Sequence, residues 1–172
     1  MGLTIHYGFT REKMPENLLK RAEEKAKKLG WKILQRSWNK LEVHPDENCE
    51  SIILHFHQAK TIKAREGWDL EKSQLEGKHS EDEDWYAGGF VKTHYAGYKV
   101  HIEVAEFLRW FGSYCEKKEV YDESGYYEIG YSEEEVERMK EYLNDYNKSL
   151  SSLASKLKDV FGSENVVSGG DL

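Results

Sequence analysis

The segment from Thr93 to Tyr131 holds the residues whose types and spacing could do chemistry. Two histidines flank a glycine turn ahead of an amphipathic stretch, and two adjacent carboxylates follow. Imidazoles and carboxylates that converge can hold a divalent metal or transfer protons during hydrolysis. The candidate catalytic residues of such a metal-assisted hydrolase-type enzyme are His94, His101, Asp122 and Glu123. Their spacing matches no standard zinc motif, so the alternative is structural: histidines hydrogen-bonded at element ends, and turn carboxylates that accept backbone N–H groups.

A second histidine pair, His55 and His57, lies in the clearest strand pattern of the chain. Side chains two residues apart on a strand share a face at a spacing of about 7 Å, so the pair can ligate one metal. With His101 these two histidines are the candidate metal ligands. No third ligand accompanies the pair in the sequence, which leaves a metal-free exposed sheet face as the alternative. The sequence therefore predicts no cofactor beyond, at most, a divalent metal.

Tyrosines crowd the region around the same carboxylates. An aromatic rim there could bind a ligand or partner, because a tyrosine offers an apolar ring and a polar hydroxyl. Tyr121 and Tyr131 belong to this group, and the alternative is that the tyrosines pack in the core. The candidate binding residues are Tyr98, Tyr126, Tyr127 and Glu128.

Familiar catalytic signatures are missing. The chain has no GxGxxG, Walker, HExxH or GxSxG motif, and its two cysteines, Cys49 and Cys115, form no CxxC pair. Nucleotide-dependent, protease and esterase functions therefore lack support. A non-catalytic binding or interaction domain is the favoured hypothesis, and the metal-assisted enzyme is the alternative.

The elements that must position these residues can be read from periodicity. Alternating apolar residues predict strands, a 3.6-residue period predicts helices, and Gly125 suits a hairpin loop between Glu119–Asp122 and Tyr126–Ile129. The fold class that follows is α+β, a mainly antiparallel sheet with two shorter helices and a long C-terminal helix. Besides the hairpin and the long helix, the predicted elements are strands at 3–7, 51–57 and 90–95, an irregular extended stretch at 31–43, and helices at 15–30 and 100–114.

The last helix is the strongest local prediction. Ser132 and Glu135 form a capping box, and apolar residues then recur in steps of three and four from Val136 to Val160. A helix over 132–161 would be about 45 Å long, longer than the roughly 30 Å diameter of a small domain. We therefore expect a homodimer or a protein partner along this helix, or alternatively a helix that lies across the sheet.

Composition limits the partners. The 172 residues carry a net charge of −7 with a pI of about 5.6, so nucleic acid is an unlikely partner despite a lysine-rich first helix. No apolar run approaches the about 18 residues of a membrane span, and the N-terminus lacks a signal-peptide pattern, which predicts a soluble, cytoplasmic protein. Its 33% charged residues are typical of thermophile proteins. We expect one α+β domain over 1–162, with an acidic loop or insertion at 66–89, and a disordered tail at 163–172.

The chain contains the run T-H-Y-A-G-Y-K-V-H-I-E-V-A-E-F-L-R-W-F, followed downstream by D-E-S-G-Y-Y-E-I-G. In this it resembles a group of uncharacterised prokaryotic proteins, which share an A-G...H-I...L segment and a D-E-x-G-Y-W/Y-E-x-G hairpin. The resemblance covers about positions 90 to 131 and, faintly, the first helix. It implies no activity or cofactor. It implies that one set of residues acts together, namely His101, Asp122, Glu123, Gly125, Tyr127 and Glu128.

Overall fold

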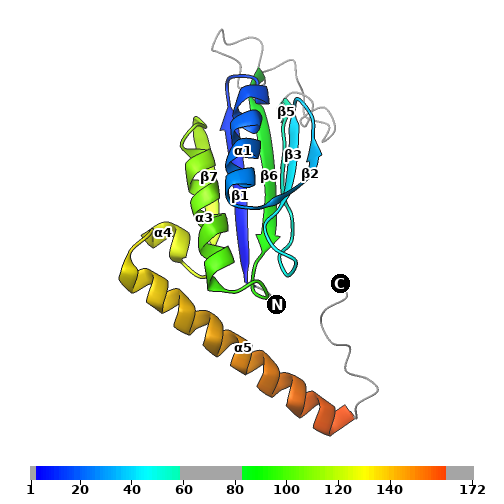
Figure 1. Cartoon of the computed structure of the whole chain (residues 1–172), viewed down its shortest axis with the longest axis vertical. Helices are drawn as coiled ribbons and strands as arrows, with labels where there is room; N and C mark the ends of the chain where they lie inside the picture. Colours follow the sequence, from blue (N-terminus) through cyan, green and yellow to red (C-terminus); the bar gives the residue numbers. More distant parts are fainter. Residues whose placement is uncertain (1–2, 59–82, 162–172) are drawn as a thin grey trace, which may run out of the picture.

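Two antiparallel sheets form the framework of the computed structural model, which describes residues 3–58 and 83–161 (Figure 1). The four-stranded sheet has the order β5-β6-β1-β7, and the three-stranded sheet has the order β2-β3-β4. Every strand pair is antiparallel. The strands are β1 (Thr4–Arg11), β2 (Lys32–Arg36), β3 (Lys40–His44), β4 (Ile52–His55), β5 (His57–Gln58), β6 (Trp85–Lys92) and β7 (Lys117–Asp122).

The side chain of Tyr7 joins the two sheets. β4 runs beside β6 and leads directly into β5, yet β4 and β6 are not paired in either sheet. The Tyr7 hydroxyl links β1 to β4 across this seam between the two sheets. It donates to the Ile53 carbonyl at 3.0 Å and accepts from the Ile53 N–H at 3.0 Å. The ring reaches β4 by passing over Gly89, its partner on β6. Burial raises the pKa of Tyr7 to about 12, so the phenol stays protonated and able to donate.

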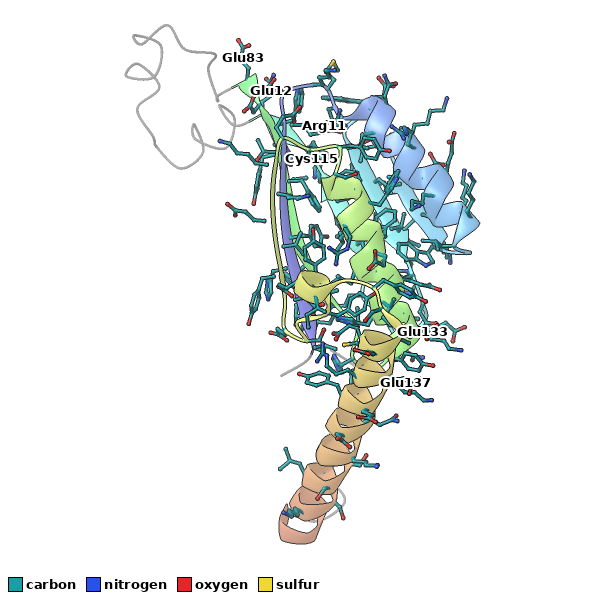
Figure 2. All side chains as sticks on the ribbon, turned by 90° about the vertical axis from the view of Figure 1, so that its left-hand side faces the viewer. Arg11, Glu12, Glu83, Cys115, Glu133 and Glu137 are labelled. Carbon is teal, nitrogen blue, oxygen red and sulfur yellow. The ribbon has the colours of Figure 1, made fainter. Side chains whose placement is uncertain are left out.

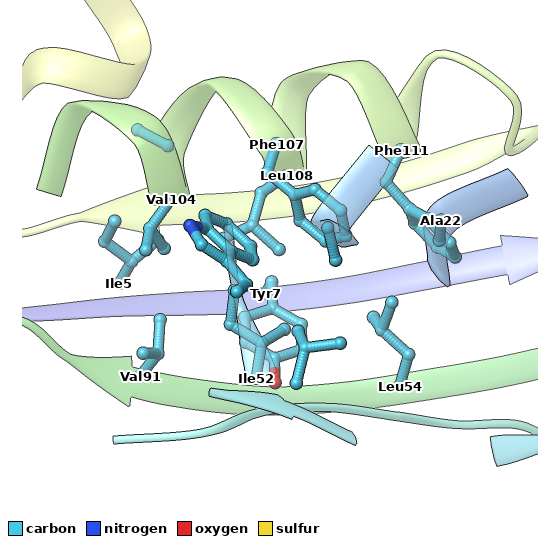
Figure 3. Packing of buried hydrophobic residues seen from close by; sticks show 14 of the residues in the cluster. Ile5, Tyr7, Ala22, Ile52, Leu54, Val91, Val104, Phe107, Leu108 and Phe111 are labelled. Carbon is cyan, nitrogen blue, oxygen red and sulfur yellow. The ribbon is translucent and has the colours of Figure 1, made fainter. Parts of the chain in front are cut away.

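Helices α1 (Glu16–Lys28) and α3 (Tyr98–Gly112) cover one face of this framework. Figure 2 shows β1 and β7 nearly edge-on with α3 to one side, and the core fills the space between them (Figures 2 and 3). β1 contributes alternate residues such as Ile5 and Phe9, and α3 contributes residues three and four apart, as the two periodicities require. The α3 members of the core are Val104, Phe107, Leu108 and Phe111.

The chain ends in two helices, α4 (Tyr126–Ile129) and α5 (Glu133–Phe161). The Ser132 hydroxyl accepts the Glu135 N–H at 3.1 Å, which is the serine half of the predicted capping box. The Glu135 carboxylate accepts from Arg138 Nε at 2.8 Å. Met139 and Leu143 are buried near α3 and α4, after which α5 leaves the body of the molecule (Figures 1 and 2). The 29 residues of α5 span about 43 Å. The helix therefore projects from the body of the molecule and does not lie across the sheet (Figure 1).

The α+β class and the antiparallel pairing are confirmed, and several details differ from the prediction. The predicted hairpin is wrong, because Tyr126–Ile129 is the short helix α4 and not a strand. Gly125 adopts φ 76 as expected of a turn residue, but the Asp122 and Ser124 side chains accept the first N–H groups of α4 and start a helical turn. The described part of the chain thus has one short helix, α4, in addition to the three helices predicted.

Boundaries also differ. The irregular stretch at 31–43 consists of the paired strands β2 and β3, with a bulge near Leu34. The predicted strand at 90–95 begins earlier, at Trp85, and ends at Lys92, so the last residues of the predicted acidic loop belong to β6. Residues 66–82 of that loop and the predicted tail at 163–172 lie outside the described residues. Within the described ranges, no helix is both long and apolar enough to cross a membrane.

Candidate functional site

The fold brings His101 and Asp122 together in a buried hydrogen-bond network. His101 lies in the first turn of α3, Asp122 is the last residue of β7, and Thr93 follows β6. The imidazole Nε2 lies 3.0 Å from Asp122 Oδ2 and 3.0 Å from Ser124 Oγ. On the opposite side of the ring, Nδ1 lies 2.6 Å from Thr93 Oγ1. In the neutral tautomer with its proton on Nε2, the ring donates to Asp122 and accepts from the Thr93 hydroxyl.

Four hydrogen bonds converge on the Asp122 carboxylate. Oδ1 accepts from the Ser124 N–H at 2.9 Å and from the Ser124 hydroxyl at 2.8 Å. Oδ2 accepts from the Tyr127 N–H at 3.0 Å and faces His101. Burial by itself would raise the pKa of Asp122, but the hydrogen bond and electrostatic interaction with His101 and the hydrogen bonds from Ser124 outweigh it. The pKa of Asp122 is therefore below its ordinary value, and the carboxylate is ionised at neutral pH.

The network has the connectivity of a catalytic triad, but its hydroxyl and imidazole are not exposed to solvent. Hydroxyl, imidazole and carboxylate are joined through opposite ring nitrogens, as in Thr93–His101–Asp122. A nucleophile must also reach a substrate, and both Thr93 and His101 are 0% exposed. Ser124 shares Nε2 with Asp122, which is not the triad arrangement. The geometry is that of a structural tie between the ends of β6, α3 and β7.

The other two candidate catalytic residues make different contacts. Glu123 Oε2 accepts the Thr4 N–H at 2.8 Å, and the Glu123 N–H donates to the Thr4 carbonyl at 3.1 Å, which extends the β1–β7 pairing by one residue. His94 is buried, and the centroids of the His94 and Tyr95 rings are 3.8 Å apart. Burial, followed by the charge of Lys92, lowers the pKa of His94. Within residues 3–58 and 83–161, no three His, Cys, Asp or Glu residues are grouped so as to hold a metal ion.

The candidate binding residues do not form an exposed rim. Tyr126 is 0% exposed and donates its hydroxyl to Glu106 at 3.0 Å; burial and Glu106 both raise its pKa. Tyr127 is half-buried beneath the Arg109 guanidinium, which lies 4.5 Å from the ring centroid. Glu128 is exposed, with one carboxylate oxygen 3.3 Å from the Asp122 N–H, and Tyr98 is half-buried.

An exposed aromatic cluster lies elsewhere, on the sheet face opposite the helices. Tyr121 is 62% exposed there, and its ring lies 6.3 Å from that of His6, which in turn lies 6.1 Å from Phe90. We call His6, Tyr86, Phe90 and Tyr121 the outer-face patch. Sequence reasoning placed Tyr121 in a rim but missed the patch, because its members come from three strands. Alternation in β1 predicts that His6 faces outward, but only the strand register brings Phe90 and Tyr121 to its sides.

The remaining metal candidates, His55 and His57, also lie on the outer face. His57 is opposite Tyr86 and His55 is opposite Lys40 in the strand register. Their ring centroids are 4.0 Å apart, closer than a regular strand would place them.

The outer half of α5, which we define as residues 146–161, holds a further exposed apolar residue. Leu153 is 54% exposed and follows Met139 and Leu143 in the seven-residue pattern. Tyr146, Leu150, Leu157 and Val160 belong to the same pattern in the sequence.

Comparisons with models of protein families, with curated proteins and with solved structures find no match for this chain.

Proposed function

We propose that this protein is a non-catalytic interaction protein that self-associates through the outer half of α5. The observation that carries the proposal is the departure of α5 from the body after Leu143, with its apolar pattern continuing to Val160. A helix that is apolar along one side gains free energy by burying that side against another helix. The exposed Leu153 lies in the middle of the outer half of α5.

Charge favours a second copy in antiparallel orientation as the occupant. Residues 133–145 contain six acidic and two basic side chains, whereas residues 146–161 contain three lysines and one aspartate. Two outer halves that pair antiparallel direct each positive end toward the acidic base of the other helix. Parallel pairing would set the positive segments side by side. A two-fold axis makes such a contact self-complementary.

The flanks of the apolar pattern support self-association. The residues beside the pattern in the outer half are Asn147, Ser149, Ala154, Lys156 and Phe161. Only Lys156 among them is charged, so two identical helices meet little like-charge repulsion next to the seam. Such a dimer would present two outer-face patches, each a cluster of exposed aromatic side chains able to contact a further partner.

Light scattering coupled to gel filtration, run over a range of protein concentrations, tests the proposal. The wild-type protein is expected at twice the 20.1 kDa mass of the chain, and Leu153→Glu is expected at 20.1 kDa. Ser155→Glu is the matched control, because it adds the same charge to the same helix at an exposed position outside the apolar pattern. A wild-type protein that stays monomeric at every concentration, or a Leu153→Glu variant that stays dimeric, would overturn the proposal.

A further inference from the structure

We propose that His55 and His57 form a two-histidine binding site for a divalent transition-metal ion, with Cu²⁺ preferred. Both side chains lie half-buried on the outer face of the sheet, with ring centroids 4.0 Å apart. Imidazole nitrogens bind zinc, copper and nickel, and a given nitrogen site binds Cu²⁺ most tightly of these. Two protein ligands leave coordination positions open for water or for a group from another molecule.

An interruption of the strand brings the rings together. On a regular strand, side chains two residues apart are separated by about 7 Å. Here β4 ends at His55 and β5 begins at His57, so Phe56 belongs to neither strand. The Phe56 ring is fully buried on the opposite face, which directs the flanking histidines outward. The backbone therefore departs from the regular pleat at Phe56, between the two histidines whose rings approach each other.

Asn39 holds the interruption in place. The Phe56 N–H donates to the Asn39 carbonyl at 2.8 Å, and the Phe56 carbonyl accepts from Asn39 Nδ2 at 3.0 Å. Asn39 Oδ1 is in turn 3.2 Å from the Ser37 hydroxyl. Both backbone groups between the two histidines are thus bound by one residue. A metal that binds the pair meets a backbone that Asn39 already fixes, so less free energy is lost to ordering it.

Charged side chains lie beside the pair. Lys40 is opposite His55 in the strand register, and its positive charge would oppose a bound cation. The Lys40 ammonium lies 2.7 Å from Gln35 Oε1 and 3.8 Å from Glu42 Oε2. Glu42 therefore offsets part of the positive charge that would oppose a bound cation.

Titration calorimetry of the full chain with CuCl₂ at pH 7.4 tests the site. We expect one Cu²⁺ per chain, and affinity at least about tenfold weaker in both His55→Ala and His57→Ala, because loss of a ligand costs no less than loss of a supporting group. His6→Ala, which removes an exposed histidine from the same face, is the matched control and keeps wild-type affinity. Electron paramagnetic resonance of the bound Cu²⁺ is expected to show two coordinated nitrogens.

A variant of the supporting residue separates a built site from two nearby histidines. Asn39→Ala leaves both imidazoles but frees Phe56, so Cu²⁺ affinity is expected to fall by about tenfold or more. Circular dichroism spectra and melts establish that each variant is folded. The proposal is overturned by wild-type protein that does not bind Cu²⁺, by wild-type affinity in the His55→Ala/His57→Ala double variant, or by equal loss in His6→Ala.

Discussion

Replacement of Asp122 by alanine should destabilise the protein strongly. The substitution removes the acceptor of four hydrogen bonds and leaves the N–H groups of Ser124 and Tyr127 and one side of His101 without it. A buried donor without an acceptor costs about 1–3 kcal/mol. Three buried donors, the N–H groups of Ser124 and Tyr127 and the His101 ring, lose this acceptor, so the total cost is about 3 kcal/mol or more. We expect a loss of about 3–5 kcal/mol from a free energy of unfolding of about 5–15 kcal/mol.

Asp122→Asn is the matched variant of similar shape. It keeps one acceptor oxygen but turns the other into an NH₂ group that faces existing donors, because each carboxylate oxygen accepts two hydrogen bonds. We expect an intermediate loss of about 1–3 kcal/mol. Urea denaturation at pH 7, followed by circular dichroism, measures both variants against the wild type. A loss below about 0.5 kcal/mol for Asp122→Ala, the range of ordinary surface substitutions, would refute the reasoning.

The pH dependence gives a second check on the same carboxylate. Because the pKa of Asp122 is lower in the folded than in the unfolded chain, its contribution to stability is complete above the unfolded value of 3.8. That contribution is lost as the pH falls through the folded-state pKa. The stability difference between the wild type and Asp122→Asn should therefore narrow when denaturation is repeated below pH 4. A difference that stays constant from pH 7 into this acidic range would contradict the assignment.

Two further predictions concern the seam between the sheets and the start of α5. Tyr7→Phe should lower the free energy of unfolding by about 1–3 kcal/mol, because the backbone groups of Ile53 lose their hydrogen-bond partner. Tyr121→Phe is the control at an exposed position, and it should change the free energy of unfolding by less than about 0.5 kcal/mol. Equal values for the two variants in urea denaturation would refute a role for the Tyr7 hydroxyl. Ser132→Ala should cost about 1 kcal/mol through loss of the helix cap, and an unchanged melting temperature would refute this.

Local patterns in the sequence were enough to predict several elements. Alternating apolar residues predicted β1 and β4, and the seven-residue pattern with its Ser132 cap predicted α5 almost to its ends. These predictions succeed because a strand or helix that buries one side carries its own period in the sequence. The α+β class and antiparallel pairing followed from the order of such elements. The clearest failure was the predicted hairpin, where the Asp122 and Ser124 side chains accept backbone N–H groups and favour a helical turn over a strand.

Only the tertiary structure decided which candidate residues meet and which of them are buried. The sequence singled out His101 and Asp122, but only packing shows that Thr93 completes their network and that the ring is sealed from solvent. Likewise, the outer-face patch depends on strand register, and the backbone of Phe56 between His55 and His57 is hydrogen-bonded to Asn39, which is distant in sequence. Burial, register and long-range hydrogen bonds arise from contacts between separate segments. Local periodicity carries no record of them, because it reports only how each segment divides its own faces between core and solvent.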